Sequence, residues 1–173
     1  MKDRRLTYII PAVMLLAVSI PGCSPRQEHI SAGDRTITSA QLRTMISEFR
    51  APVTLVHVWA TWCLPCRKEF PVLMKLRSAF GSNDISLVLI STDDPRESGR
   101  VRRFLKEFGG GHPSLIIDNP SAHFIDTLDT AWSGAIPASF FFDSRGRLLE
   151  WWEGETNFVR YKAVIDQHLH RAR

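Results

Sequence analysis

A C-x-x-C motif stands directly behind an apolar run, and this junction constrains the fold more than any other feature of the chain. Val53–Trp59 is mostly β-branched and apolar, which is typical of a strand buried on both faces. Apolar residues then recur at helical spacing from Leu64 to Phe80, which predicts a helix. Cys63 and Cys66 fall at the start of that helix, where a separation of three residues brings two sulfur atoms within bonding range. The junction therefore predicts a strand–turn–helix unit that can carry a disulfide.

Cys63 is expected at the N-cap of this helix, where unpaired backbone N–H groups and the positive end of the helix dipole favour a thiolate. Such an environment lowers a thiol pKa from about 8.5 to about 3.5–7.5, and the thiolate is the species that attacks a disulfide. Cys66 lies one turn further on, and we expect it to be more buried and to resolve the mixed disulfide. Pro65 suits the first helical turn, because it lacks an N–H that would stay unpaired there.

Residues 1–22 have the pattern of an export signal. A basic start is followed by the apolar run Leu6–Ile20, which is short for a membrane span of about 20 residues. Ile20-Pro21-Gly22-Cys23 resembles a bacterial lipobox, in which cleavage precedes the cysteine and its sulfur receives a lipid. Pro21 departs from that pattern, so an uncleaved anchor and a plain secretory signal stay open as alternatives. The polar residues 23–35 are expected to form a flexible tether, which would hold an exported domain to a membrane at the periplasmic or cell-surface side through Cys23.

The chain has three cysteines, and this number limits their roles. If Cys23 is acylated, only Cys63 and Cys66 remain, and no long-range structural disulfide can form. A C-x-x-C pair in an oxidising compartment is then a redox device or part of a metal site. A zinc ribbon needs a second ligand pair at similar spacing, and the sequence has none, so no bound metal is expected. The net charge of +4 forms no concentrated basic stripe and gives no case for nucleic-acid binding.

Strands and helices alternate along the rest of the chain before a closing hairpin and helix, an order that favours parallel pairing. The predicted strands are 53–59, 85–91, 114–117, 138–143 and 148–153; the predicted helices are 41–49, 64–80, 95–108, one that starts at 119–120, and 157–170. Thr38-x-x-Gln41 has the form of a capping box, and Gly81 is expected to cap the end of the second helix. We expect one α/β domain over residues 36–173, with a central mixed sheet flanked by helices on both faces.

The Trp-Ala-x-Trp-Cys-x-x-Cys pattern of Trp59–Cys66 resembles the signature of the thioredoxin superfamily. Arg67–Pro71 is similar to its TlpA/ResA-like, membrane-anchored branch, and Gly134–Phe140 resembles the cis-proline loop of the family. The resemblance covers residues 36–170 and implies a thioredoxin-like fold. It also implies a protein-disulfide reductase with no cofactor beyond its cysteine pair, in cytochrome c maturation, in copper-site maturation or with a general clientele. Its implied partners are disulfide-containing proteins and a membrane electron donor of the DsbD or CcdA kind.

The same resemblance implies roles for the residues around the cysteines. Pro137 is expected to be cis and to lie beside them, and the backbone of Ile136 is expected to pair with a substrate peptide as an added strand. Two tryptophans are expected to wall the site and to offer an apolar face to a partner. The expected substrate-binding residues are Trp59, Trp62, Leu64, Pro65 and Ile136.

Two positions depart from the family pattern. His57 stands where thioredoxins carry a buried Asp, and it is either a proton shuttle for Cys66 or a neutral, hydrogen-bonded core histidine. The TlpA/ResA-like branch often places a Glu after its second strand, which corresponds to the predicted strand 85–91 here. Asp93 aligns best with that Glu. Asp93 is expected to exchange protons with Cys66, with its pKa raised by burial. The alternative role is a helix cap, which Asp94 fits well.

Two other functions fit parts of the sequence. A peroxiredoxin-like enzyme needs a Thr three residues before its reactive Cys, but Thr61 lies two before Cys63. A copper-binding module without redox turnover would use the two cysteines and His57 or Met74, because thiolates suit Cu(I). An assay of insulin reduction by dithiothreitol distinguishes a metal carrier from an oxidoreductase, because an oxidoreductase accelerates the reduction and a pure metal carrier shows little turnover.

The helix over 95–108 carries basic residues on its outer face, and these are expected to form a solvated surface: Arg100, Arg102, Arg103 and Lys106. Side chains alternate between the two faces of a strand. One ring of Trp151 and Trp152 is therefore expected to pack inward and the other to face out.

Overall fold

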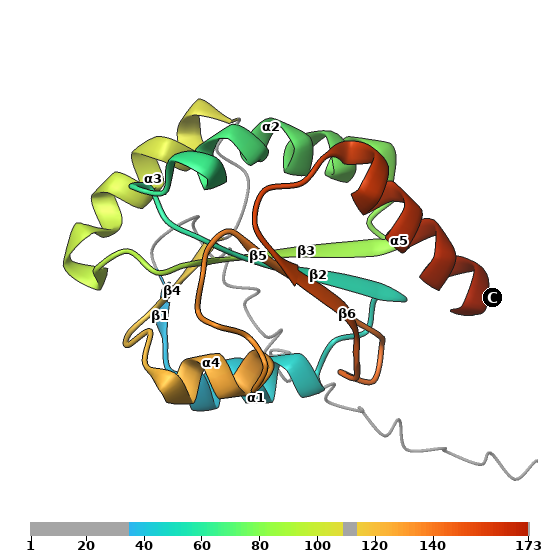
Figure 1. Cartoon of the computed structure of the whole chain (residues 1–173), viewed down its shortest axis with the longest axis horizontal. Coiled ribbons are helices and arrows are strands. Elements are labelled where there is room, and N and C mark those ends of the chain that lie inside the picture. Colours follow the sequence, from blue (N-terminus) through green and yellow to red (C-terminus); the bar gives the residue numbers. More distant parts are fainter. Residues whose placement is uncertain (1–34, 109–113, 173) are drawn as a thin grey trace, which may run out of the picture.

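The computed structural model describes residues 35–108 and 114–172, and it has a six-stranded sheet at its centre (Figure 1). The strand order is β1-β4-β3-β2-β5-β6. β2, β3, β4 and β1 run parallel, whereas β5 is antiparallel to β2, and β6 is antiparallel to β5. The strands are β1 (Arg35–Ile37), β2 (Val53–Trp59), β3 (Ile85–Ser91), β4 (Ser114–Ile117), β5 (Ala138–Phe142) and β6 (Leu148–Glu153).

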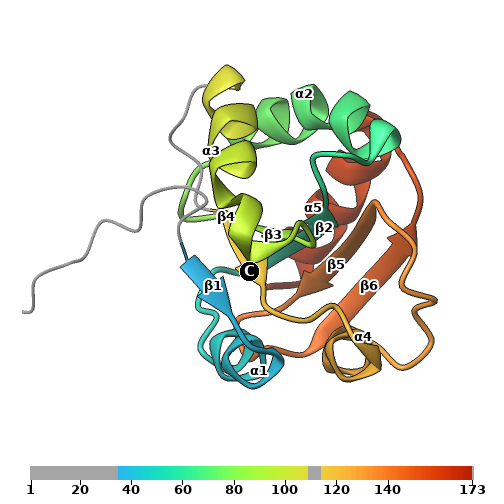
Figure 2. The ribbon, with the colours of Figure 1, turned by 90° about the vertical axis from the view of Figure 1, so that its left-hand side faces the viewer.

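Helices cover both faces of this sheet, with α2, α3 and α5 on one side and α1 and α4 on the other (Figures 1 and 2). Each face has its own apolar core, and the alternating side chains of β2 contribute to both. All seven residues of β2 are buried, as expected for a strand covered on both faces. The helices are α1 (Ser39–Ser47), α2 (Leu64–Ala79), α3 (Ser98–Glu107), α4 (Ala122–Leu128) and α5 (Phe158–Ala172), with a 3₁₀ turn at Pro95–Glu97. The expected mixed sheet with helices on both faces is confirmed, as is the thioredoxin-like fold.

The capping box at the start of α1 is confirmed by both of its hydrogen bonds. The backbone N–H of Gln41 donates to Oγ1 of Thr38, at 3.1 Å, and the Thr38 N–H donates to Oε1 of Gln41, at 2.8 Å. The expected cap at Gly81 is wrong. α2 ends at Ala79, and its C-cap is Phe80, which has extended backbone angles and whose N–H donates to the carbonyl oxygen of Leu76. Gly81 does not have the positive φ of a glycine cap.

The short strand β1 was not expected, and it starts inside the segment interpreted as a tether. Its three residues pair parallel with Leu115–Ile117 of β4, and Ile37 is buried. A strand of three residues carries too few alternations to be recognised from its pattern alone. The expected outward-facing tryptophan is also wrong: the Trp151 ring stacks on Phe140 at 5.7 Å, while Trp152 packs on Tyr161 on the other face.

The expected signal peptide, the lipidated Cys23 and most of the tether lie outside the described residues. Within residues 35–108 and 114–172, none of the helices combines the length and the hydropathy that crossing a membrane requires.

Candidate active site

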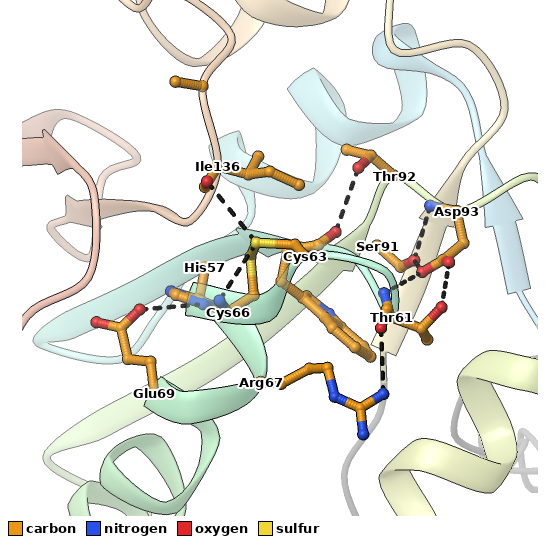
Figure 3. Close-up of a disulfide and its surroundings, with 12 residues drawn as sticks. His57, Thr61, Cys63, Cys66, Arg67, Glu69, Ser91, Thr92, Asp93 and Ile136 are labelled. Atoms are coloured by element: carbon orange, nitrogen blue, oxygen red, sulfur yellow. Dashed lines mark hydrogen bonds and ion pairs between the residues drawn. A yellow bond between two sulfur atoms is a disulfide. The ribbon is translucent and has the colours of Figure 1, made fainter.

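Cys63 and Cys66 form a disulfide at the junction between β2 and α2 (Figure 3). Their Cα atoms are 5.3 Å apart. Cys63 is the N-cap of α2, as expected, and its Sγ accepts a hydrogen bond from the backbone N–H of Cys66, at 3.2 Å. Because the same N–H stabilises a thiolate on Cys63 in the reduced chain, the helix start favours the charged form of this thiol. Cys63 keeps 5% of its surface exposed, whereas Cys66 is fully buried, so a partner can reach only the first sulfur.

Asp93 holds the loop that leads to Cys63, and it does not contact either sulfur. One carboxylate oxygen accepts from the backbone N–H of Thr61 at 2.9 Å and from the Ser91 hydroxyl at 2.6 Å, and the other accepts from the Thr61 hydroxyl at 2.5 Å. Both oxygens are thus engaged on the side of the disulfide away from Glu69 (Figure 3). The expected proton exchange between Asp93 and Cys66 is not supported by this placement. The helix cap belongs to Asp94, which accepts from the Arg96 N–H at 2.9 Å.

Replacement of Asp93 by alanine tests this assignment. The change removes the acceptor of three buried donors, the Thr61 N–H and the hydroxyl groups of Thr61 and Ser91, so the free energy of unfolding should fall by about 3 kcal/mol. Disulfide exchange should slow at every pH, because the loop no longer holds Cys63 in place. Urea unfolding and rates from pH 5 to 9 measure both effects. A change in the shape of the pH–rate profile would instead identify Asp93 as a proton-transfer group.

The cis-proline loop packs against the exposed edge of the disulfide. The Ile136–Pro137 peptide bond is cis, as expected. The carbonyl oxygen of Ile136 lies 3.7 Å from Sγ of Cys63 (Figure 3), so a Cys63 thiol could donate to it in the reduced chain. Gly134 precedes this turn with a φ of 87°, and a Cβ there would lie 2.9 Å from Cδ1 of Ile125. Glycine meets both requirements, since it has no side chain.

Only one of the two signature tryptophans faces solvent. Trp62 is 63% exposed and Leu64 is 61% exposed, and they flank Cys63 on the surface. Trp59 is fully buried between Phe70 and Phe104, and its indole N–H donates to the Ser114 hydroxyl at 3.3 Å. The expectation that Trp59 contacts a substrate is therefore wrong, because none of its surface is accessible. Pro65 is exposed in the first turn of α2, next to Leu64.

A buried polar cluster lies under the disulfide, between β2, α2 and α5. Nδ1 of His57 is 3.0 Å from the Ser139 hydroxyl, which is 2.6 Å from the Tyr161 hydroxyl. Tyr161 donates to Oε1 of Glu69 at 3.0 Å, and the same oxygen accepts from the Thr156 N–H at 3.0 Å. The alternation of β2 explains the position of His57, which shares a face with the core residues beneath α2 and lies opposite Ser139 in the register of β5.

His57 and Glu69 face each other inside this cluster, where burial disfavours the imidazolium form of His57 and the carboxylate form of Glu69. Nε2 of His57 and Oε2 of Glu69 are 3.8 Å apart, and within the described residues neither atom has a hydrogen-bond partner. Burial lowers the pKa of His57 to about 3 and raises the pKa of Glu69 to about 7. His57 is thus neutral at physiological pH, which matches the core-histidine alternative and argues against the proton shuttle. Glu69 is the group that titrates near neutrality.

The sequence analysis missed Glu69, although the sequence contains a signal for it. Glu69 lies three residues after Cys66 and shares the buried face of α2 with Cys66, Phe70 and Leu73. A carboxylate in the apolar stripe of a helix must be neutral or hydrogen-bonded, since an unpaired buried charge is costly. A charged residue at such a position is a candidate for a functional group with a shifted pKa.

The structure brings no set of metal ligands together in the residues that it describes. No group of three or more His, Cys, Asp or Glu side chains in residues 35–108 and 114–172 is arranged to hold a metal ion. His57, considered for copper, uses Nδ1 in the contact with Ser139.

Comparison with known proteins places the chain in a family. The model of the Redoxin family matches residues 27–165. The thiol-disulfide oxidoreductase ResA of Geobacillus kaustophilus (strain HTA426) is 25% identical over 124 residues, which are 72% of this chain and 65% of the relative, so the chain spans less than two thirds of that protein. The thiol:disulfide interchange protein DsbE of Pseudomonas fluorescens biotype C is 29% identical over 143 residues, which are 78% of this chain and 71% of the relative.

The fold comparison agrees with the family match. A crystal structure of a thioredoxin-related protein from Neisseria meningitidis serogroup B has a TM-score of 0.59 and 28% sequence identity, and it covers 69% of this chain and 87% of that one. The family model covers well over half of the chain. The cysteine pair of the chain lies at a helix start beside a cis-proline. The chain therefore belongs to the Redoxin family and is a thioredoxin-superfamily protein of the TlpA/ResA-like kind.

Proposed function

We propose that this chain is an extracytoplasmic thiol–disulfide oxidoreductase that reduces disulfides in partner proteins. The observation that carries the proposal is the position of Cys63: at the N-cap of α2, at the surface, with its partner sulfur on Cys66 buried behind it. The names of the ResA and DsbE relatives support the reaction class. The lipobox-like Cys23 supports attachment to a membrane through lipid, and a donor of the DsbD or CcdA kind would renew the dithiol there.

The proposed reaction is a two-step exchange. The Cys63 thiolate attacks one sulfur of the partner's disulfide, that bond breaks, and the other partner sulfur leaves and takes up a proton. Cys66 then loses its proton and attacks Sγ of Cys63, which forms the Cys63–Cys66 disulfide and releases the second partner sulfur to be protonated. Over both steps the partner gains two electrons and two protons, and the dithiol loses them. One of these protons leaves Cys63 when it ionises, and the other leaves Cys66.

The second step needs a base for the buried Cys66 thiol, and we assign this role to Glu69. The two side chains share the buried face of α2 one turn apart, where helix neighbours at this spacing meet. The pKa of Glu69, raised to about 7 mainly by burial, lets it take up and return a proton near neutral pH. Tyr161 and the Thr156 N–H fix the carboxyl group in place.

Exposed apolar side chains beside Cys63 support a protein substrate. Trp62 and Leu64 present large apolar surface at the site, and such exposure marks interaction surfaces. A pocket of about 200 Å³ lies between Trp62 and Ile136, and its walls include Phe124, Ile125 and Trp132. An apolar side chain of a partner peptide that pairs with the backbone of Ile136 would fit there.

Reduction of insulin by dithiothreitol tests the proposal. The chain should accelerate insulin precipitation, whereas the matched Cys63→Ser variant should give only the uncatalysed rate. The reduction potential of the cysteine pair decides the direction of exchange. A value near that of thioredoxin, about −270 mV, supports reduction of the partner, and a value near that of DsbA, about −120 mV, would assign oxidation of partner thiols instead. A wild-type rate equal to that of dithiothreitol alone would contradict the proposal.

A further inference from the structure

A second pocket opens on the other side of Trp62, between the first turns of α2 and the exposed face of α3. It has a volume of about 280 Å³. Its walls combine the loop that precedes Cys63, the start of α2 and one face of α3: Thr61, Trp62, Arg67, Arg100, Arg103, Phe104 and Glu107. Trp62 precedes Cys63 directly, and Arg67 follows it by four residues, so the pocket opens about one helical turn from the attacking sulfur.

This pocket is lined by more positive than negative charge. Three arginines line it against one carboxylate, that of Glu107. Arg100 is also paired with the exposed Glu97 at 3.0 Å, so a surplus of one positive charge remains when both carboxylates are counted. α3 itself carries four cations and one carboxylate, a surplus of three in a chain whose net charge is +4. The lining of the pocket is therefore net positive, and the helix that supplies four of its seven residues is basic as well.

Arg67 is held in an orientation suited to bind an anion. Its guanidinium lies 5.2 Å from the centroid of the Phe104 ring, and one N–H donates to the Thr61 carbonyl at 3.4 Å (Figure 3). A guanidinium has five N–H donors, and it matches the geometry of a carboxylate. A stacked, partly anchored arginine also loses less conformational entropy when it binds a ligand than a free side chain does.

We propose that this pocket is a subsite for a carboxylate side chain of the partner, so that the protein prefers disulfides flanked by Asp or Glu. The inference rests on the proposed disulfide exchange and names the substrate class of the same site. Charge complementarity supplies the attraction. A protein carboxylate fits better than the headgroups of a membrane, because two walls of the pocket, Trp62 and Arg67, belong to the segment that carries the disulfide. A group bound there is delivered together with the sulfur that Cys63 attacks.

The test uses peptides with one disulfide loop. At each position that flanks a cysteine, three peptides are compared, which carry Glu, Gln or Lys there. Dithiothreitol supplies electrons, and kcat/KM is measured for each peptide. At low salt the Glu peptide should exceed the Gln peptide by about fivefold at the best position, with the Lys peptide lowest, as expected for solvent-exposed charge pairs. The preference should shrink at high ionic strength.

Matched variants show whether the preference for the Glu peptide comes from the pocket or from the overall positive charge of α3. Arg103→Gln should remove most of the preference for the Glu peptide, and Glu107→Gln should increase it. Arg102→Gln deletes the same charge from the same helix at a position that does not line the pocket, so it should leave most of the preference intact. An equal loss in Arg102→Gln would overturn the subsite.

Two further results would overturn the inference, and they differ from a failure of the proposed function. One is an equal kcat/KM for all three peptides. The other is an Arg103→Gln variant that keeps the peptide ranking but no longer binds vesicles of phosphatidylglycerol and phosphatidylcholine, which would assign the basic surface to a membrane. In both cases the Gln peptide is still reduced. If the wild-type chain reduces none of the peptides, the proposed function fails, and this inference fails with it.

Discussion

Replacement of Cys66 by serine is expected to abolish multiple turnover and to leave partner proteins attached to the chain through Cys63. The serine hydroxyl cannot attack the mixed disulfide, and Cys66 is the buried sulfur bonded to Cys63 in the structure. Turnover with insulin should fall to the uncatalysed rate, while a stable adduct accumulates. Non-reducing electrophoresis followed by mass spectrometry of the adduct measures the linkage and identifies the attached protein.

The matched variant for this experiment is Cys63→Ser. With Cys23 also replaced by serine in both variants, the one thiol left in this variant is that of Cys66, which is fully buried, so it should form almost no adduct. Adducts that form through Cys66 in this variant, or no adducts in Cys66→Ser, would contradict the assignment of Cys63 as the attacking residue.

Replacement of Glu69 by glutamine is expected to slow resolution of the mixed disulfide by about 10²-fold at pH 8, a typical contribution of a general base. In the wild-type chain this rate should rise with pH around a pKa near 7, where Glu69 loses its proton. The variant should lack that rise. Below about pH 6 the two rates should converge, because wild-type Glu69 is then protonated. Rapid mixing of a preformed mixed disulfide from pH 5 to 9 measures the profile.

The same substitution should stabilise the folded chain at alkaline pH. Burial raises the pKa of Glu69 from 4.5 to about 7, so the folded chain holds this proton more tightly than the unfolded chain does. Stability therefore falls as pH rises from 4.5 to about 7, by about 3 kcal/mol at 1.36 kcal/mol per unit. Glu69→Gln removes this loss, so its urea midpoint should exceed that of the wild type at pH 8. Lower stability at pH 8 together with a normal rate would contradict the assignment.

His57→Asn is the matched control for the pH profile. The pKa of His57, lowered to about 3 by burial, lies below the range of the rate measurement. The variant should therefore keep the inflection near pH 7. An inflection that disappears in His57→Asn and persists in Glu69→Gln would restore His57 as the proton shuttle.

The parts of the fold and the site that could be predicted depend on short, local patterns. The strand Val53–Trp59 and the placement of Cys63 at the N-cap follow from contiguous residues, and both are confirmed. The cis bond before Pro137 was implied by the resemblance and is confirmed. Such features need no knowledge of distant contacts, so a sequence pattern is enough to identify them.

The features that could not be predicted depend on which face of an element is covered. Trp59 and Trp62 share one motif, yet alternation along β2 directs Trp59 beneath α2 and α3, whereas Trp62 lies beyond the end of the strand and stays exposed. Asp93 was placed near Cys66 by alignment, but its oxygens bind the Thr61 loop. The environment of Glu69 depends on α5, which places Tyr161 beside it, and the two residues are far apart in the sequence.

Titration of the Cys63 thiol tests the central claim most directly. In the reduced chain, with Cys23 replaced by serine so that no third thiol reacts, the rate of iodoacetamide alkylation at Cys63 is followed from pH 3 to 10 by mass spectrometry. A thiolate held at the N-cap of α2 predicts an inflection between about 3.5 and 7.5. An inflection near 8.5, the value of a free cysteine, would contradict the account.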